Sequence, residues 1–517
     1  MTLVRERDSE ILAQFAIPIR GTWKNIAIND VPLDAVFDSL NIFIREGKVR
    51  TRPGLSLFSD TTFLEPIIGG SMVVTPGEKV ILGITKDRIY QLSDITDLWT
   101  TIQPTGFDPT IADDDNKVID MAFMETAGDY VALIASEGRV LKKWIDSPRS
   151  FATLTGTNIP RAKSVCIAGS RVIALIPPHT IVWSNVLNPA VFDTLAYAKR
   201  AQSGDRGVCV RTLSALSFVF YKERSIHIAR AQAGVDEGTA FSFSEPLYVD
   251  GPAGIYSIVN VNGVHYYMTH NGRICAFDGT TYPRWIADGL WFFLQADIQP
   301  SQAHLIRSIY DYRLHTITFF YPKKDLGPGL RGMVLINLPF EGQDIQEMAT
   351  TRAFLGTCQK AISHACEKRW DDQLTVDRSL MFTKQLDSGD RNEAFLLDES
   401  VTTDDGIPYQ CSFQTGLQAM PDARHTHVCI ETFLERGVGY GSILVEPVIS
   451  DALETREGTI IDQSGQWIDL ETNPIREYKG FGRQVRFFGL RYSWDSSNYV
   501  RYSGSVVYTS TPQKYRV

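Results

Sequence analysis

The sequence predicts a mainly β protein whose central part is a β-propeller, and three observations lead to this prediction. Five short passages share one pattern, an apolar β-prone run, a polar turn and a second run, which is typical of a β-hairpin. Their turns lie 41 to 51 residues apart, the spacing of four-stranded propeller blades. After about residue 400 this period disappears. The five passages are Ile81–Leu92, Ala132–Trp144, Ala174–Ser184, Phe218–Ala229 and Tyr266–Gly279.

A single hairpin cannot bury its apolar face, so these units must stack on one another, and a closed ring also removes most exposed strand edges. We therefore expect residues 59–400 to form the propeller. The pattern continues, more stretched, in Leu305–Tyr321, Met333–Leu338 and Leu380–Leu397. We count six blades, with seven as the alternative. Residues 341–377 are richer in Gln, Ala, Glu and Lys, and we expect an insertion there that could hold a short helix.

The two ends of the chain lack the blade period. Residues 1–58 form a leader with one hairpin, in which Asn41–Arg45 is a strand, Glu46-Gly47 is the turn, and Arg52-Pro53-Gly54 ends the second strand because Pro cannot donate to a ladder. Residues 401–517 predict an antiparallel, sandwich-like β domain. Since chain ends often lie close together, we expect the leader to pack on this domain. Its longest β-prone stretches are Val428–Leu434, Ser442–Ile449, Gln484–Trp494 and Tyr499–Thr509.

Composition describes an ordinary soluble protein, since 44% of the 517 residues are hydrophobic and 21% are charged. The first twenty residues carry Arg5, Arg7 and Asp8 where a secretory signal would need an apolar stretch, and no later run reaches the length of a membrane span. We expect synthesis in the cytoplasm. The thiols Cys166, Cys209, Cys275 and Cys429 lie in strand-like runs and are expected to be small buried groups.

The net charge of −9 argues against a protein that binds nucleic acid tightly, because affinity for phosphates comes from Lys and Arg side chains that displace counterions. It does not exclude a surface past which DNA slides. A weakly acidic wall would hinder a moving duplex less than a basic one.

Several motifs have a competing, purely structural interpretation. Gly327–Gly332 matches the dinucleotide fingerprint as a string, but a strand follows it instead of the helix that pyrophosphate binding needs, so we predict a loop. His425, His427 and Cys429 alternate on a probable strand and are either zinc ligands or a polar strand face. Two weaker candidates for metal are Cys358, His364 and Cys366, and the acidic turn Asp113–Asn116.

No nucleophile elbow, zincin motif or Walker lysine occurs in the sequence. We therefore predict a protein that is not an enzyme, with no catalytic residue, cofactor or metal. A glycosidase needs only two carboxylates close together in space, so this alternative stays open. Five aromatic residues could line a sugar platform, but we expect them to pack between neighbouring sheets: Trp183, Trp285, Trp291, Tyr266 and Tyr267.

Two passages resemble the nozzle and DNA-stabilisation proteins that close the tail tube of short-tailed bacteriophages. The first is the leader hairpin, with its asparagine-bearing strand, glycine turn and terminal arginine-proline-glycine. The second, residues 182–193 (VWSNVLNPAVFD), is similar to a tryptophan-serine, asparagine-proline, aromatic-aspartate string in the blades of such proteins. The matching residues are Asn41, Gly47, Arg50, Arg52, Pro53, Gly54, Trp183, Ser184, Asn188 and Pro189.

The resemblance implies a structural virion protein that forms a six-copy ring, the tail nozzle, beneath a portal and its adaptor. It implies that the ring retains packaged double-stranded DNA and conducts it during ejection, without specific binding, and that fibres, spikes or a needle could dock on it. Two alternatives remain from the residues alone. One is a propeller glycoside hydrolase or lyase, and the other is a carbohydrate-binding module that recognises a receptor.

Overall fold

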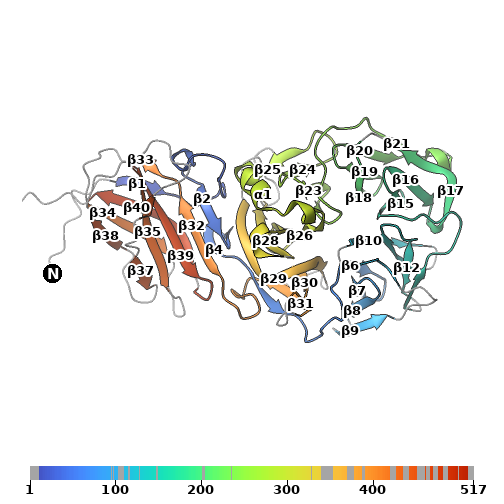
Figure 1. Cartoon of the computed structure of the whole chain (residues 1–517), viewed down its shortest axis with the longest axis horizontal. Helices are drawn as coiled ribbons and strands as arrows, with labels where there is room; N and C mark the ends of the chain where they lie inside the picture. The colour runs from blue at the N-terminus through green and yellow to red at the C-terminus, as the bar shows by residue number, and fades with distance from the viewer. Residues whose placement is uncertain are drawn as a thin grey trace, which may run out of the picture.

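The chain is built mainly from antiparallel β-strands, which form a ring of small sheets and, beside it, two larger sheets (Figure 1). None of the helices in the described part of the chain is both long and apolar enough to cross a membrane. The computed structural model describes residues 11–94, 96, 98–102, 110–114, 117–126, 129–146, 149–200, 204–233, 236–327, 329–338, 353–369, 378–386, 391–419, 427–434, 442–450, 460–461, 466–469, 476–480, 487–498 and 500–509.

Five sheets of four strands follow one another along the chain, each with its strands in sequence order. The first contains β6 (Gly69–Val74), β7 (Lys79–Ile84), β8 (Ile89–Ser93) and β9 (Trp99–Ile102). The second contains β10 (Ile119–Glu125), β11 (Tyr130–Ser136), β12 (Lys142–Ile145) and β13 (Ser150–Thr153). The third contains β14 (Ser164–Ala168), β15 (Arg171–Ile176), β16 (Thr180–Asn185) and β17 (Asn188–Lys199). The fourth contains β18 (Gly207–Ser214), β19 (Ser217–Lys222), β20 (Ile226–Ala231) and β21 (Phe241–Phe243). The fifth contains β22 (Ile258–Val261), β23 (Val264–Met268), β24 (Ile274–Phe277) and β25 (Arg284–Ile286).

A seven-stranded sheet completes the ring and consists of two four-stranded units that share one strand. The shared strand, β29 (Ala353–Lys368), pairs with β28 through its first residues and with β30 through its last ones. It is therefore the outer strand of the sixth unit and the inner strand of the seventh. The other strands are β26 (Arg307–Asp311), β27 (Thr316–Pro322), β28 (Leu330–Asn337), β30 (Arg378–Thr383), β31 (Ala394–Asp398) and β5 (Gly54–Leu57).

The described part of the chain thus holds seven four-stranded units when β29 is counted in two of them, whereas six were expected, with seven as the alternative. Seven hydrophobic clusters join each unit to the next, and the last of them joins the seventh unit to the first. In that cluster Phe382 of β30 packs with Ile81 of β7. The apolar faces that no single hairpin can bury are covered in this way around the whole ring, which closes a propeller-like fold.

The ring is closed by a strand from the leader. β5 pairs with β31, with Leu57 opposite Phe395 and Gly54 opposite Asp398. The outermost strand of the seventh unit therefore comes from the N-terminal end of the chain, and the other three come from the far end of the ring sequence. This pairing ties the two ends of the ring together by backbone hydrogen bonds.

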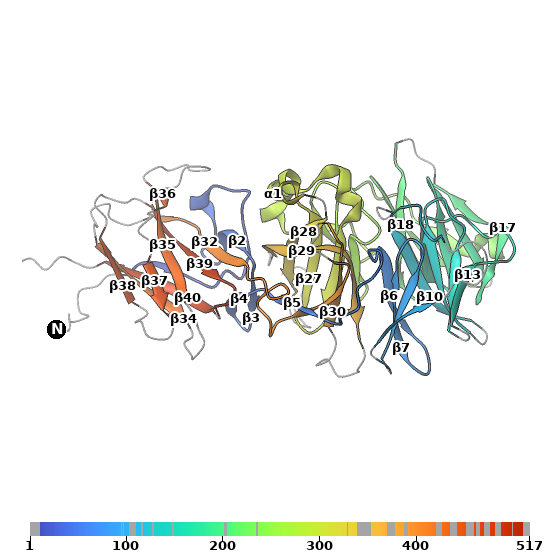
Figure 2. The same cartoon turned by 60° about the horizontal axis from the view of Figure 1, so that its bottom comes forward.

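Beside the ring, two larger antiparallel sheets contain strands from both ends of the chain (Figure 2). One holds β1 (Ile11–Phe15), β3 (Ile42–Arg45), β4 (Lys48–Thr51), β34 (His427–Leu434), β38 (Arg476–Gly480) and β40 (Arg501–Thr509). The other holds β2 (Val36–Leu40), β32 (Gln410–Thr415), β33 (Gln418–Ala419), β35 (Ser442–Ser450), β36 (Ile460–Ile461), β37 (Gln466–Asp469) and β39 (Phe487–Asp495). Residues from both sheets, among them Phe15, Tyr502, Phe413 and Trp494, share one hydrophobic core.

All five hairpins predicted from the repeated passages are present, and they are the second and third strands of the first five units. The leader hairpin is also present, with a two-residue turn at Glu46-Gly47. The expected helix is not found in Ala353–Lys368, which is the strand β29, and the rest of residues 341–377, apart from Arg369, lies outside the described residues. Within the described residues, the helices are α1 (Trp291–Asp297) and the 3-10 turns η2 (Ile28–Asp30), η3 (Glu237–Thr239), η4 (Asp288–Leu290), η5 (Pro300–Leu305) and η6 (Lys324–Leu326).

Candidate functional site: a polar cavity on the axis of the ring

A cavity of about 980 Å³ opens at one end of the ring axis. Its wall consists of the turns between the second and third strands of several units, and of the segments that enter the inner strand of each following unit. Glu137, Glu223 and His270 come from turns of the first kind, and Lys163 and Arg206 from segments of the second kind. Successive units of the repeated fold therefore each contribute a polar loop to the wall of this cavity.

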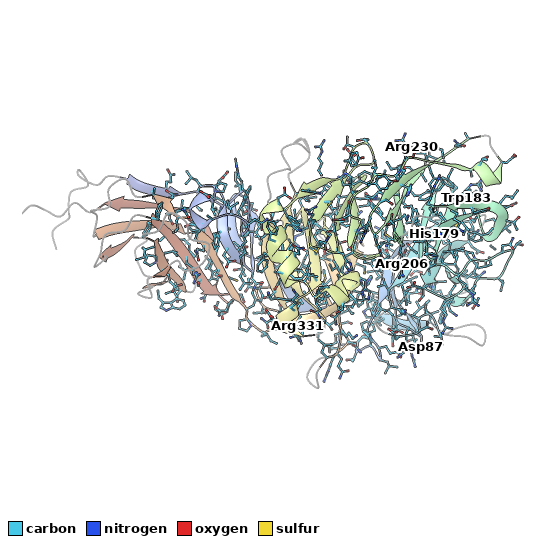
Figure 3. All side chains as sticks on the ribbon, turned by 45° about the horizontal axis from the view of Figure 1, so that its top comes forward. Asp87, His179, Trp183, Arg206, Arg230 and Arg331 are labelled. Atoms are coloured by element: carbon cyan, nitrogen blue, oxygen red, sulfur yellow. The ribbon has the colours of Figure 1, made fainter. Side chains whose placement is uncertain are left out.

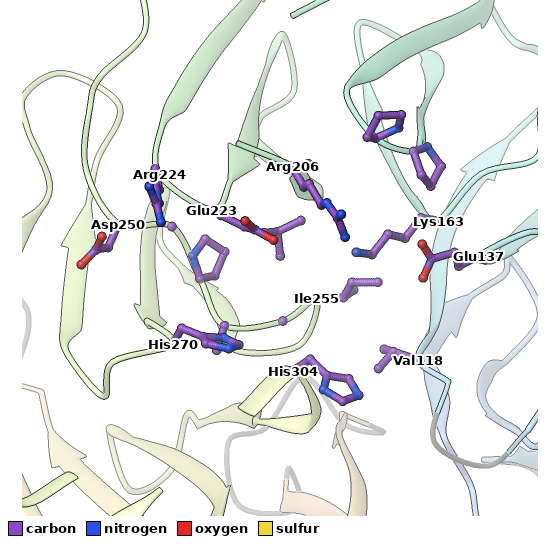
Figure 4. Close-up of a pocket in the computed structure, with 18 of the residues that line it drawn as sticks. Val118, Glu137, Lys163, Arg206, Glu223, Arg224, Asp250, Ile255, His270 and His304 are labelled. Carbon is purple, nitrogen blue, oxygen red and sulfur yellow. The ribbon is translucent and has the colours of Figure 1, made fainter. Parts of the chain in front are cut away.

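The charges in this cavity are balanced. Its charged lining residues are Asp114, Glu137, Glu223, Asp250, Lys117, Lys163, Arg206 and Arg224, together with His270 and His304. Figure 4 shows Lys163, Arg206 and Glu137 on one side of the space, and Arg224 and Asp250 on the other. A cavity of this size with donors and acceptors of both signs is suited to a polar ligand with many hydrogen-bonding groups.

Hydrogen bonds also join the innermost strands of different units. Asp120 of β10 accepts hydrogen bonds from the hydroxyl of Ser164 (2.6 Å), the backbone N–H of Val165 (2.9 Å) and the guanidinium of Arg211 (2.8 Å). Arg211 also donates to the carbonyl of Ile255 (2.6 Å). Burial alone would lower the pKa of Arg211, but the charge of Asp120 outweighs burial and the pKa is raised. The innermost strands of the second, third and fourth units are therefore joined to one another by side-chain hydrogen bonds.

A second group of buried side chains lies at the axis. The guanidinium of Arg307, 2% exposed, donates to the carbonyls of Leu305 (2.8 Å) and Ile306 (3.4 Å) and lies 5.2 Å from the ring of Tyr256. Burial lowers the pKa of Arg307 to about 10. His364 donates from Nε2 to the carbonyl of Gly70 (3.0 Å), and burial, together with the charge of Arg307, lowers its pKa to about 3. His364 is therefore neutral at physiological pH.

The leader motif residues form a buried network where the ring meets the two larger sheets. Asn41, with a left-handed φ of 57°, accepts hydrogen bonds at Oδ1 from Nε of Arg52 (3.0 Å) and from the backbone N–H of Thr357 (2.8 Å). Its Nδ2 donates to the carbonyl of Gln410 (2.8 Å). One asparagine side chain thus bonds to the leader, to β29 of the ring and to β32 of a larger sheet.

Arg52 is the centre of this network. Its guanidinium makes two hydrogen bonds to Asp404 (2.6 and 3.0 Å) and one to the carbonyl of Thr357 (2.7 Å), and it stacks 3.8 Å above the ring centroid of Tyr409. Arg52 is 1% exposed and Asp404 is fully buried. Burial alone would lower the pKa of Arg52, but the charge of Asp404 raises it. Tyr409 returns a hydrogen bond to the carbonyl of Arg52 (2.7 Å).

The remaining leader motif residues have local structural roles. Gly47 has a φ of 67° in the hairpin turn, and Arg50 pairs with Glu46 across that turn. Pro53 accepts a hydrogen bond from Arg52 at its carbonyl (2.7 Å). Gly54 begins β5, where a Cβ atom would lie only 2.3 Å from the carbonyl oxygen of Thr403.

The second motif forms the turn between β16 and β17. Trp183 is buried between the third and fourth units (Figure 3). The hydroxyl of Ser184 accepts from the backbone N–H of Val172 (3.0 Å). Asn188 accepts from the backbone N–H of Ala190 (3.1 Å), and Pro189 is buried at the start of β17. The family-motif residues therefore lie in two separate places, and none of them lines the cavity.

The other predicted candidates do not meet in one site. Cys358 belongs to the cluster between the sixth and seventh units, and Cys366 to the cluster between the seventh and first. His427 and Cys429 lie on β34, and His425 is outside the described residues, as are two residues of the acidic turn at 113–116. Gly327 precedes the strand β28, as expected for a loop. Within the described residues, no group of three His, Cys, Asp or Glu side chains is arranged to hold a metal ion.

The expectation that five aromatic residues pack between neighbouring sheets holds for some of them and not for others. Trp183, Tyr266 and Tyr267 pack in the core as expected, but Trp285 is 51% exposed and Trp291 is half-buried, so the expectation was wrong for Trp285. Apart from one residue of the acidic turn, the cavity residues are not among those predicted from the sequence. The polar turns of the repeated hairpins were the signal that could have found them, because equivalent turns of a ring must meet at one end of it.

No protein-family model matches the chain. No curated protein matches it either. Among solved structures, the one described as "Structure of U3-55K" is similar with a TM-score of 0.43 and 11% sequence identity, over 67% of this chain and 99% of that chain. We base no argument on a similarity at this level.

Proposed function

We propose that this chain is a structural protein of a short bacteriophage tail, in which six copies form the nozzle ring that retains packaged DNA and conducts it into the host. Its partners are other copies of itself, the portal adaptor above, and fibres, spikes or a needle. We further interpret the seven units as blades of a closed propeller and the two larger sheets as a β-sandwich. The protein then acts in the virion and carries out no reaction.

The observation that carries this proposal is the network of Asn41, Arg52 and Asp404. Interfaces between domains of one chain usually allow relative motion. Here, motif residues of the leader hold ring and sheets together through a buried bidentate ion pair and bonds to both sides. A second contact joins the domains, since the backbone N–H of Lys24 donates to the carbonyl of Gly289 (2.7 Å). Such a rigid block is suited to the wall of a tube under pressure.

The route of DNA in this proposal lies between copies of the chain. Inside the single ring, Arg211 of the fourth unit bonds to Asp120 of the second, and the hydroxyl of Tyr256, just before the fifth unit, donates to the carbonyl of Ile119 in the second (2.8 Å). A duplex would therefore pass through the centre of the six-copy assembly. The net charge of −9 favours a wall to which DNA does not adhere.

Electron microscopy of the purified protein tests the proposal. We expect closed rings of six copies with an axial channel, and the same rings at the tail tip of the particle that carries the chain. The enzyme alternative instead predicts a monomer that cleaves a glycan in the cavity. Monomers at concentrations of about 10 μM, together with glycan turnover, would overturn the proposal.

A further inference from the structure

An aromatic cluster on the fifth unit lies beside the cavity. The guanidinium carbon of Arg273 lies over two indole rings, 4.0 Å from the centroid of Trp285 and 3.8 Å from that of Trp291. Phe292 stacks on Trp291 with a centroid separation of 4.4 Å. We propose that this cluster, defined as Arg273, Trp285, Trp291 and Phe292, binds a hexose oligosaccharide, with the cavity accommodating the rest of its chain.

The exposure of the cluster is the first argument. Large aromatic side chains in the ring mostly pack in the core, as Trp144 and Trp183 do. Trp285 and Phe292 are instead more than half exposed. An exposed indole offers a flat apolar surface that fits the C–H face of a hexose ring, and its immobilisation costs little entropy because it has only two rotatable bonds.

The hydrogen-bonding groups of the cluster are the second argument. Within the described residues, the buried Nε of Arg273 has no hydrogen-bond partner. The charge of Asp288, which follows the same outer strand, is close enough to interact with Arg273. A donor and an acceptor beside an apolar plane match the alternating hydroxyls and C–H groups of a sugar.

Continuity with the cavity is the third argument. The indole N–H of Trp291 donates to the carbonyl of Asn271 (3.2 Å), and Asn271 and His270 line the cavity. The cluster and the cavity therefore share one rim. A volume of about 980 Å³ is within the range of ligand sites and has room for several sugar rings. The balanced charges inside favour a neutral, hydroxyl-rich ligand over a polyanion. This inference does not depend on ring assembly.

The experiment compares two exposed tryptophans. Trp285→Ala removes the proposed platform, and Trp467→Ala is the matched control, since Trp467 is 57% exposed on a larger sheet. Calorimetric titration with hexasaccharides of glucose, galactose and mannose should show binding of at least one of them. We expect Trp285→Ala to weaken this binding at least about tenfold, and Trp467→Ala to leave it within about twofold.

The inference is overturned if no hexasaccharide binds at about 10 mM, or if both variants lose binding equally. If Trp285→Ala instead abolishes ring formation with no effect on sugar binding, the cluster is a contact between copies and the inference is wrong. Thermal denaturation of each variant distinguishes a lost site from a lost fold. Failure of the wild type to form rings would count against the tail function alone.

Discussion

Arg52 shows how one side chain can join two domains. Its guanidinium satisfies both oxygens of Asp404 and a carbonyl of the ring, and its charge is covered by Tyr409. A buried ion pair of this kind adds little net stability, because both charges lose their hydration. Its value lies in specificity, since few other arrangements of ring and sheets would pair the two charges.

Removing one partner of this pair should be costly. Arg52→Met leaves Asp404 buried without its countercharge, and we expect the free energy of unfolding to fall by about 3–5 kcal/mol. Arg50→Met removes a pair with Glu46 on the exposed turn, and should cost less than about 1 kcal/mol. Denaturation in urea measures both. Equal effects of the two substitutions would contradict the assigned role of Arg52.

The buried side chain of His265 should make the free energy of unfolding depend on pH. The side chain is fully buried, its Nε2 donates to the carbonyl of Thr212 (2.9 Å), and its Nδ1 accepts from the hydroxyl of Tyr221 (2.8 Å). Burial lowers its pKa to about 4. Between pH 6.5 and 4 the unfolded chain therefore binds a proton that the folded chain does not, and stability falls as the pH falls, by up to about 3 kcal/mol from this group.

His265→Gln should reduce this acid sensitivity. We expect a smaller loss of unfolding free energy between pH 7 and pH 5 than in the wild type, whatever the stability of the variant at pH 7. His270→Gln, which removes an exposed imidazole, is the control variant. Urea denaturation at both pH values gives the comparison, and an unchanged dependence in His265→Gln would refute the assignment.

At the scale of elements, closure of the ring depends on β5 passing very close to the neighbouring backbone. The backbone N–H of Gly54 donates to the carbonyl of Val401 (2.7 Å), and an added Cβ would lie 2.3 Å from the oxygen of Thr403. Gly54→Ala must therefore push β5 away from its neighbours, and should lower stability by about 1–3 kcal/mol. Gly77→Ala, on an open turn with nothing within 4 Å, should change it by less than about 0.5 kcal/mol. Thermal denaturation compares the two.

The elements also show what sequence patterns can and cannot predict. The hairpins were predictable because each pairs apolar runs across a polar turn, and local chemistry determines that pairing. β29 was not, because it serves two units without a turn between them. Its residues Gln359 to Lys368 include Ala, Glu and Lys, which are depleted in strands, so propensity suggested a helix there. Pairing with β28 and β30 overrides that preference, and β29 then belongs to two four-stranded units.

At the scale of the whole molecule, the candidate site was less predictable than the fold. No single passage contains it, because the cavity draws residues from turns between Asp114 and His304. The leader motif was recognisable as a string, yet its partners Thr357 and Asp404 are more than 300 residues away in sequence. Such large sequence separations between contacting residues follow from the ring topology. A local sequence pattern does not encode that topology.

The pairing of β5 with β31 has a consequence for how the protein is made. During translation, β5 leaves the ribosome about 340 residues before its partner, which at 5–20 residues per second is an interval of roughly 17 to 70 seconds. For that time the nascent chain carries an unpaired strand and an incomplete circle of blades. Chaperones that shield such edges would therefore act on this polypeptide until the final blade emerges.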